Sequence, residues 1–173
     1  MQMEAQSLQH NGAMKSLICI HKNESGEPHG EIFNRYLKKP IAFTGVMSLI
    51  NKMDDLCDQT GYPQAYNHYR SFGEKKKPQE IGIMNEAKND MSDSLLESKT
   101  GDKATFIIQV QFRQNSSWQG TITWAERKKT QRYRSTLEMI KLMDSALAEE
   151  EEIPVEIIDW SKPSFDNLYI NEK

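Results

Sequence analysis

A shift of the chain by 90 positions aligns its first half with its second half without a gap. Over the 42 positions from Leu17 to Asp58, eight residues are identical to the residue 90 positions later, where unrelated sequences give roughly two or three. The identical pairs are Ile18 and Ile108, Gly30 and Gly120, Ile32 and Ile122, Lys38 and Lys128, Lys39 and Lys129, Ile50 and Ile140, Met53 and Met143, and Asp54 and Asp144. We interpret this similarity as an internal duplication.

Each half has the pattern of three strands followed by a helix. In the second half, apolar residues at every other position predict a strand with one apolar face: Phe106, Ile108, Val110 and Phe112. The turn RQNSSWQG follows, and GTITWAE then predicts the partner strand. The first half repeats this order with the strand SLICI, the turn HKNESGEPHG and the strand EIFNRYL.

Both helices have recognisable starts. Ser135 and Glu138 have the spacing of a capping box, which predicts that the second helix begins at Ser135. In the first half, Thr44 is the predicted N-cap, and the apolar residues after it recur at intervals of three and four. This spacing predicts one apolar helix face.

These signals predict an α+β fold with two βββα units, at about 16–58 and 106–148, an antiparallel sheet and helices packed on one face. One unit buries too little apolar surface alone, whereas two units can share a core. We divide the single compact domain into a flexible tail (1–15), the first unit with an aromatic connector (16–72), a polar loop (73–103), the second unit (104–148), and an acidic run with an extra strand and tail (149–173).

Composition excludes several classes of protein. The net charge of −3 is typical of neither a general nucleic-acid binder nor an acidic mimic. Cys19 and Cys57 correspond to Gln109 and Leu147 in the second unit, so no required disulfide is expected. The chain has neither the apolar core of a signal peptide nor an apolar run as long as a membrane span. We expect a soluble, cytoplasmic protein that does not contact a membrane.

The sequence contains no recognisable catalytic or metal-binding motif. The four histidines have no acid or cysteine at a meaningful spacing, and the glycines are dispersed through turns rather than gathered in a phosphate loop. We interpret the equivalent Asp54 and Asp144 as carboxylates that meet Lys or Arg, not as a catalytic pair. The expectation is a protein that is not an enzyme and has no cofactor or metal.

Positive charge is concentrated in the second unit. From Arg113 to Lys141 there are seven basic residues and two acidic ones. Cations mixed with aromatic residues are typical of surfaces that bind single-stranded nucleic acid or a phosphate backbone. A solvated strand edge with lysines that discourage aggregation explains much of the same pattern, and Lys38 and Lys39 repeat the charge in the first unit. The candidate binding residues are Arg113, Trp118, Trp124, Arg127, Lys128, Lys129, Arg132 and Arg134.

The two units contain paired motifs: LICI, G-x-I-x-N and F-T-x-x-M-x-L-I-x-x-M-D in the first, and FRQNSSWQGTITW and YRSTLEMIKLMDSAL in the second. In these motifs the chain resembles a family of small proteins from Clostridia and their phages and mobile elements. This family includes type II-A anti-CRISPR proteins, which inhibit the nuclease Cas9. The resemblance covers about 15–72 and 104–148 and implies stoichiometric binding of Cas9 or its guide-RNA complex in a bacterial host cell. The alternative is a regulatory protein that binds nucleic acid through the basic segment. The sequence leaves the oligomeric state open.

Overall fold

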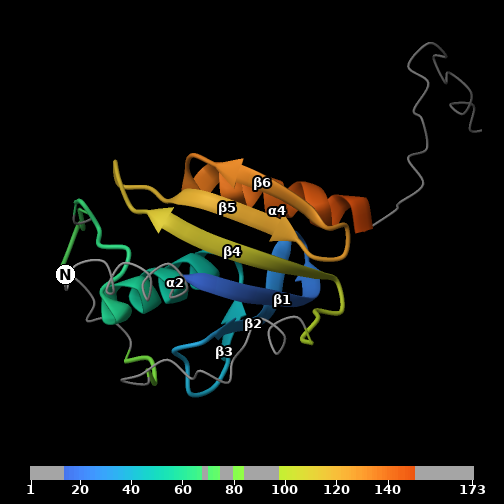
Figure 1. Cartoon of the computed structure of the whole chain (residues 1–173), viewed down its shortest axis with the longest axis horizontal. Helices are drawn as coiled ribbons and strands as arrows, with labels where there is room; N and C mark the ends of the chain where they lie inside the picture. The colour runs from blue at the N-terminus through green and yellow to red at the C-terminus, as the bar shows by residue number, and fades with distance from the viewer. Residues whose placement is uncertain (1–13, 68–69, 75–79, 84–97, 151–173) are drawn as a thin grey trace, which may run out of the picture.

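A single antiparallel sheet organises the computed structural model, which describes residues 14–67, 70–74, 80–83 and 98–150. The strand order is β3-β2-β1-β4-β5-β6 (Figure 1). The strands are β1 (Lys15–Glu24), β2 (Glu27–Asn34), β3 (Ile41–Thr44), β4 (Ala104–Phe112), β5 (Gln119–Trp124) and β6 (Lys129–Tyr133), and the helices are α2 (Val46–Thr60) and α4 (Thr136–Glu150). The predicted α+β class is confirmed.

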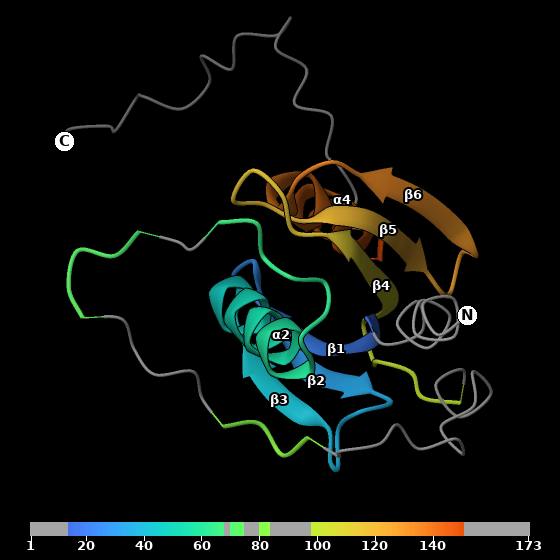
Figure 2. The same ribbon diagram turned by 60° about the vertical axis from the view of Figure 1, so that its left-hand side comes forward.

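The two units join through their first strands at the centre of the sheet. β1 pairs antiparallel with β4, with Ile18 opposite Phe106. β3 and β6 are therefore the two outer strands, as Figure 2 shows. Strand register also repeats at the 90-residue offset, because Ile18 faces Ile32 in the first unit and Ile108 faces Ile122 in the second.

Steric constraints explain why glycine occurs at the equivalent positions 30 and 120 of the two units. Gly30 and Gly120 each lie opposite a β-bulge, and a Cβ atom at either position would overlap a backbone carbonyl of the facing strand, from Cys19 or Gln109. At Gly120 the added carbon would also come within 2.8 Å of the Tyr133 hydroxyl. The bulge thus requires glycine at the two matching positions.

The main core lies between the sheet and both helices. Alternate strand residues, such as Ile18, Phe106 and Ile122, form one buried cluster with Leu49 of α2 and Met143 of α4. The two helices therefore cover the same face of the sheet, as predicted. A small second cluster on the opposite face contains Leu17, Cys19, Phe33 and Ile107.

One helix start follows the prediction and the other does not. Ser135 caps α4, because its hydroxyl accepts a hydrogen bond from Glu138 N at 3.1 Å. The prediction of Thr44 as the cap of α2 is wrong: Gly45 is the N-cap and has no side chain to offer. Instead, the Glu27 carboxylate of β2 accepts a hydrogen bond from Val46 N at 3.2 Å. A neighbouring strand therefore supplies this cap.

The bulge also changes the predicted face of β4. Phe106, Ile108 and Val110 are buried, but Phe112 is 53% exposed because the register shifts between Val110 and Phe112. A strict alternation of side chains holds only up to a bulge.

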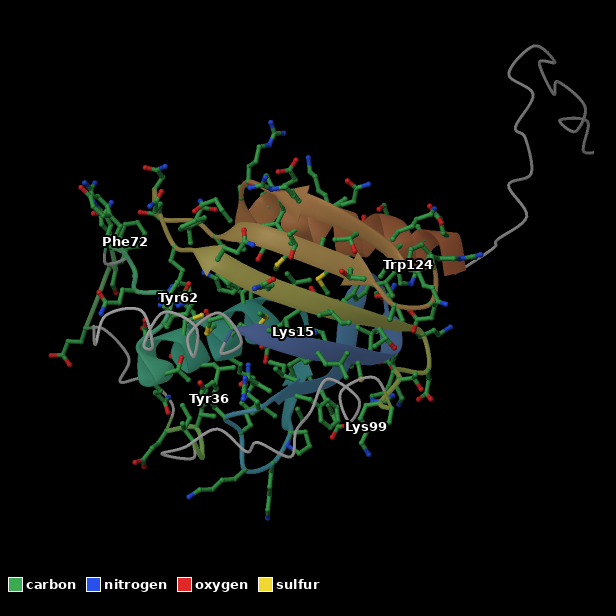
Figure 3. All side chains as sticks on the ribbon, in the orientation of Figure 1. Lys15, Tyr36, Tyr62, Phe72, Lys99 and Trp124 are labelled. Carbon is green, nitrogen blue, oxygen red and sulfur yellow. The ribbon has the colours of Figure 1, made fainter. Side chains whose placement is uncertain are left out.

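The aromatic connector after α2 forms no helix among its described residues. Tyr62 packs against Met14 and Cys57, whereas Tyr66 and Phe72 are exposed. Figure 3 shows Tyr62 beside α2 and Phe72 at the outside of the molecule. Residues 1–13 of the predicted tail, most of the polar loop 73–103 and the predicted strand after 150 lie outside the described residues. At the end of the predicted tail, Met14 is buried and Lys15 begins β1. Within the described ranges, neither helix is long and apolar enough to span a bilayer.

Candidate binding surface

The eight candidate residues fall into two separate groups. Arg113 and Trp118 lie in the interior, 4% and 1% exposed. Trp124, Arg127, Lys128, Lys129, Arg132 and Arg134 lie on or beside β6. The structure therefore corrects the expectation that one surface contains all of them.

Arg113 joins the second unit to helix α2 of the first. Its Nη1 donates to Asp58 Oδ1 at 2.7 Å and to the Pro63 carbonyl at 3.2 Å, and its Nη2 donates to Asp54 Oδ1 at 2.8 Å. Burial lowers the pKa of Arg113, but the hydrogen bond that Arg113 donates to Asp58 and the charges of the nearby negative groups raise it by more, so the guanidinium stays charged. The positive charge of Arg113 therefore pairs with Asp54 and Asp58 within the protein.

Trp118 completes this cluster. Its indole N–H donates to Asp54 Oδ1 at 3.2 Å, and its backbone N–H donates to Thr136 Oγ1 at 3.1 Å. Burial raises the pKa of Asp54 by more than the hydrogen bonds and charge of Arg113 and Trp118 lower it. The interpretation of Asp54 as a carboxylate that meets an arginine is confirmed. Its equivalent, Asp144, is exposed and forms no such pair among the described residues.

The second group forms an exposed strip, which we call the basic edge: Arg127, Lys128, Lys129, Arg132 and Arg134. It follows the outer strand β6 and the turn before it. Arg134 has an acidic partner, Glu138, whose Oε1 lies 3.1 Å from Arg134 Nη2. Lys128, Lys129 and Arg132 form no ion pair with a described residue. These three side chains therefore present positive charge that no described acidic residue pairs with.

Strand pairing divides the basic edge between two faces of the sheet. Lys129 faces the same side as Trp124, its partner on β5, which is the side covered by the helices. Arg132 faces the opposite side, with its partner Thr121. A partner that contacts both cations must therefore wrap around the edge of the sheet.

The tryptophans do not form an exposed stacking platform. Trp124 is 7% exposed, and the Arg127 guanidinium carbon lies 5.5 Å from the centre of its ring. Arg127 therefore covers a ring face that a nucleotide base would need. The predicted mixture of cation and aromatic exists, but the cation stacks on the aromatic ring of its own chain.

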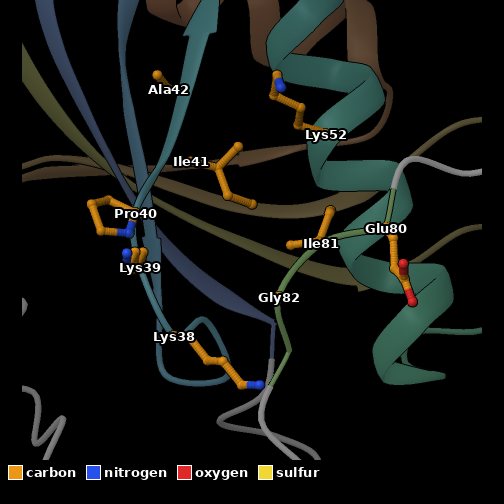
Figure 4. Close-up of a pocket in the computed structure, with 9 residues that line it drawn as sticks. All are labelled: Lys38, Lys39, Pro40, Ile41, Ala42, Lys52, Glu80, Ile81 and Gly82. Atoms are coloured by element: carbon orange, nitrogen blue, oxygen red, sulfur yellow. The ribbon is translucent and has the colours of Figure 1, made fainter.

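Two pockets lie beside the outer strands. One, of about 200 Å³, lies between β6 and α4 and has Trp124, Lys129, Leu142 and Glu149 in its wall. The other, of about 480 Å³, lies beside β3 and is surrounded by Lys38, Lys39 and Lys52, with Ile41 and Ile81 in its wall (Figure 4). The sequence marked Lys38 and Lys39, but nothing in it indicated that Lys52 and the segment 80–82 join them.

Neither a metal site nor a reactive thiol is present among the described residues. No three His, Cys, Asp or Glu side chains of these residues come close enough to hold a metal ion. Burial raises the pKa of the Cys19 thiol to about 11 and that of the Cys57 thiol to about 12, so both are protonated at neutral pH.

Comparison with known proteins gives no relative: no protein-family model, curated protein or solved structure matches this chain.

Proposed function

We propose that this protein is a non-catalytic binding protein whose partner is a protein or a ribonucleoprotein. The observation that carries the proposal is the basic edge, where Lys128, Lys129 and Arg132 are exposed and form no ion pair with a described residue. Such a strip raises the rate of encounter with an acidic or phosphate-bearing partner. Its position on an outer strand also leaves backbone groups for an added strand.

The specific partner that we propose is guide-loaded Cas9, and the proposed outcome of binding is stoichiometric inhibition. This version rests on the resemblance of the paired motifs to the family that includes type II-A anti-CRISPR proteins. We also propose that the two βββα units arose by internal duplication, supported by strand registers and bulges that repeat at the 90-residue offset. If so, most of the basic edge is specific to the second unit. Of its five cations, Lys128 and Lys129 alone have a basic residue 90 positions earlier, Lys38 and Lys39.

Co-purification with guide-loaded Cas9 tests the specific version. The wild-type chain is expected to remain on immobilised Cas9, and the Lys129→Glu, Arg132→Glu variant is expected to be lost. The matched control is Lys38→Glu, Lys39→Glu, which changes the net charge equally on the first unit. No retention of the wild-type chain rules out Cas9 as the partner, and equal loss of both variants rules out the basic edge as the specific contact.

The alternative is a regulatory protein that binds nucleic acid through the same edge. Exposed cations favour it, whereas the covered ring of Trp124 limits it to phosphate contacts. A mobility-shift titration at several salt concentrations separates the two. Backbone binding predicts an affinity that falls steeply with salt, by a logarithmic slope of roughly 0.7 to 0.9 per phosphate contacted.

A further inference from the structure

We infer that the pocket between β6 and α4 binds an extended peptide in which a carboxylate neighbours a branched aliphatic side chain. The inference rests on the proposed binding function and names the partner segment that the basic edge recognises. Three observations carry it: the chemistry of the pocket wall, an indole N–H without an acceptor, and an internal segment that fills the equivalent place in the first unit.

The wall of the pocket combines apolar surface with one lysine, Lys129, and one glutamate, Glu149. Phe106, Ile122 and Leu142 contribute apolar surface, and Lys129 stands at the edge formed by β6. The volume of about 200 Å³ suits one side chain or two small ones. An aliphatic side chain of the peptide that contacts this apolar surface thus places the carboxylate of the neighbouring peptide residue near Lys129.

Trp124 supplies a donor beside this pocket. Its indole N–H is buried and has no acceptor in the part of the chain that the structure describes. Trp118, in contrast, donates its indole N–H to the carboxylate of Asp54. A buried donor without an acceptor is unfavourable, so a ligand carboxylate that displaces the groups covering this N–H and accepts its hydrogen bond is stabilised there.

The first unit contains an example of such a segment. Ile81, 9% exposed, joins the core between β3 and α2, and its backbone N–H donates to Gln59 Oε1 at 3.1 Å. The next carbonyl, from Gly82, accepts a hydrogen bond from Lys38 N at 3.1 Å. An extended stretch of chain with one aliphatic anchor therefore fits between the outer strand and the helix (Figure 4).

The 90-residue offset gives the equivalent groups in the second unit, of which Glu149 lies in the wall of the β6–α4 pocket and Lys128 precedes the wall residue Lys129 in the chain. Lys38 corresponds to Lys128, and Gln59 corresponds to Glu149. Lys128 N already donates to the Ala125 carbonyl at 3.2 Å, so the second unit lacks that backbone donor and offers side-chain cations in its place. Glu149 opposes an acidic ligand, and Glu149→Gln is therefore expected to tighten binding.

A titration of the full-length, ¹⁵N-labelled protein tests the inference. The probe is the acetylated and amidated hexapeptide DEIEVE, and the readout is the indole N–H signal of Trp124. We expect this signal to shift, and we expect Lys129→Glu to weaken binding at least tenfold while the matched Lys39→Glu leaves it unchanged. Ser145→Phe, a substitution of an exposed residue in the pocket wall, is expected to block binding.

Three results would overturn the inference. The first is an unchanged Trp124 signal at millimolar peptide, and the second is equal weakening by Lys129→Glu and Lys39→Glu. The third concerns the sequence IPVEII at 153–158, which has the same chemistry as the probe. If DEIEVE binds to the Ile157→Ser, Ile158→Ser variant and not to the wild-type protein, the chain's own C-terminal sequence occupies the pocket in the wild type. That sequence, and not a partner peptide, is then the ligand.

The control peptide DESESE keeps the charge and removes the aliphatic anchors, so it is expected not to bind. Failure of the proposed function is distinguishable from failure of the inference. Binding of DEIEVE without retention on Cas9 contradicts Cas9 as the partner and leaves the pocket assignment intact. Retention on Cas9 without peptide binding contradicts the pocket assignment alone.

Discussion

Arg113 Nη2 lies 2.8 Å from Asp54 Oδ1, in an ion pair that joins the end of β4 to helix α2 of the other unit. The Arg113 side chain is almost fully buried, and it also holds Asp58 and the connector at Pro63. Truncation would remove the guanidinium donor from Asp58 and from the Pro63 carbonyl, and it would leave Asp54 with the Trp118 indole N–H but without its cation. We therefore expect Arg113→Ala to lower the free energy of unfolding by about 3–5 kcal/mol, measured by urea denaturation.

Arg132→Ala is the matched control for this substitution. It removes the same side-chain type from an exposed position, so the free energy of unfolding should change by no more than about 0.5 kcal/mol. Similar values for the two variants would show that Arg113 does not join the units.

Gly120→Ala tests the steric role of the shared glycine. The new methyl group would overlap the Gln109 carbonyl and press on the Tyr133 hydroxyl. We expect a loss of about 1–3 kcal/mol in the free energy of unfolding, as for other overpacked sites. Gly73→Ala, at a glycine with no atom within 4 Å of the added carbon, should be close to neutral. A neutral Gly120→Ala would contradict the bulge geometry.

Tyr133→Phe gives a prediction about pH. Burial raises the pKa of the Tyr133 phenol, whose hydroxyl donates to the Gln109 carbonyl at 3.1 Å. A raised pKa in the folded state contributes stability that is complete below the unfolded pKa of about 10 and is lost as pH rises above it. The variant should lose about 0.5–1.5 kcal/mol at pH 8 and should show a smaller further loss between pH 10 and 11 than the wild type. Equal slopes for the two proteins would contradict the burial of the phenol.

The two thiols should be unreactive in the folded protein. Cys19 and Cys57 are buried and protonated at neutral pH, because burial raises both pKa values. Ellman's reagent at pH 8 is expected to titrate neither thiol in the native protein and both in 6 M guanidinium chloride. Rapid reaction of either thiol in the native state would mean that its surroundings are open to solvent.

The sequence was sufficient for the layout of the fold. The positions that match at the 90-residue offset include Gly30 and Gly120, which the geometry of the sheet requires. Three strands and a helix in each unit, with the second helix starting at Ser135, could therefore be predicted from the sequence. The cap of α2 could not, because Glu27 reaches Val46 from a different strand. A local sequence pattern does not predict a contact between two different helices or strands.

The candidate site was predictable only in part. Lys128, Lys129 and Arg132 were marked correctly as exposed cations on a strand edge. Arg113 was not, because its acidic partners Asp54 and Asp58 lie 59 and 55 positions away in the chain. A charged residue in a sequence gives no sign of whether its charge faces solvent or a buried partner.

A cleavage titration of guide-loaded Cas9 tests the proposal that the basic edge of β6 is the contact surface of an inhibitor. Wild-type protein is expected to stop DNA cleavage near one molar equivalent, and the Lys38→Glu, Lys39→Glu variant should behave in the same way. The Lys129→Glu, Arg132→Glu variant should need at least a tenfold excess. Undiminished cleavage at a large excess of the wild-type protein, or equal inhibition by both variants, would contradict the claim.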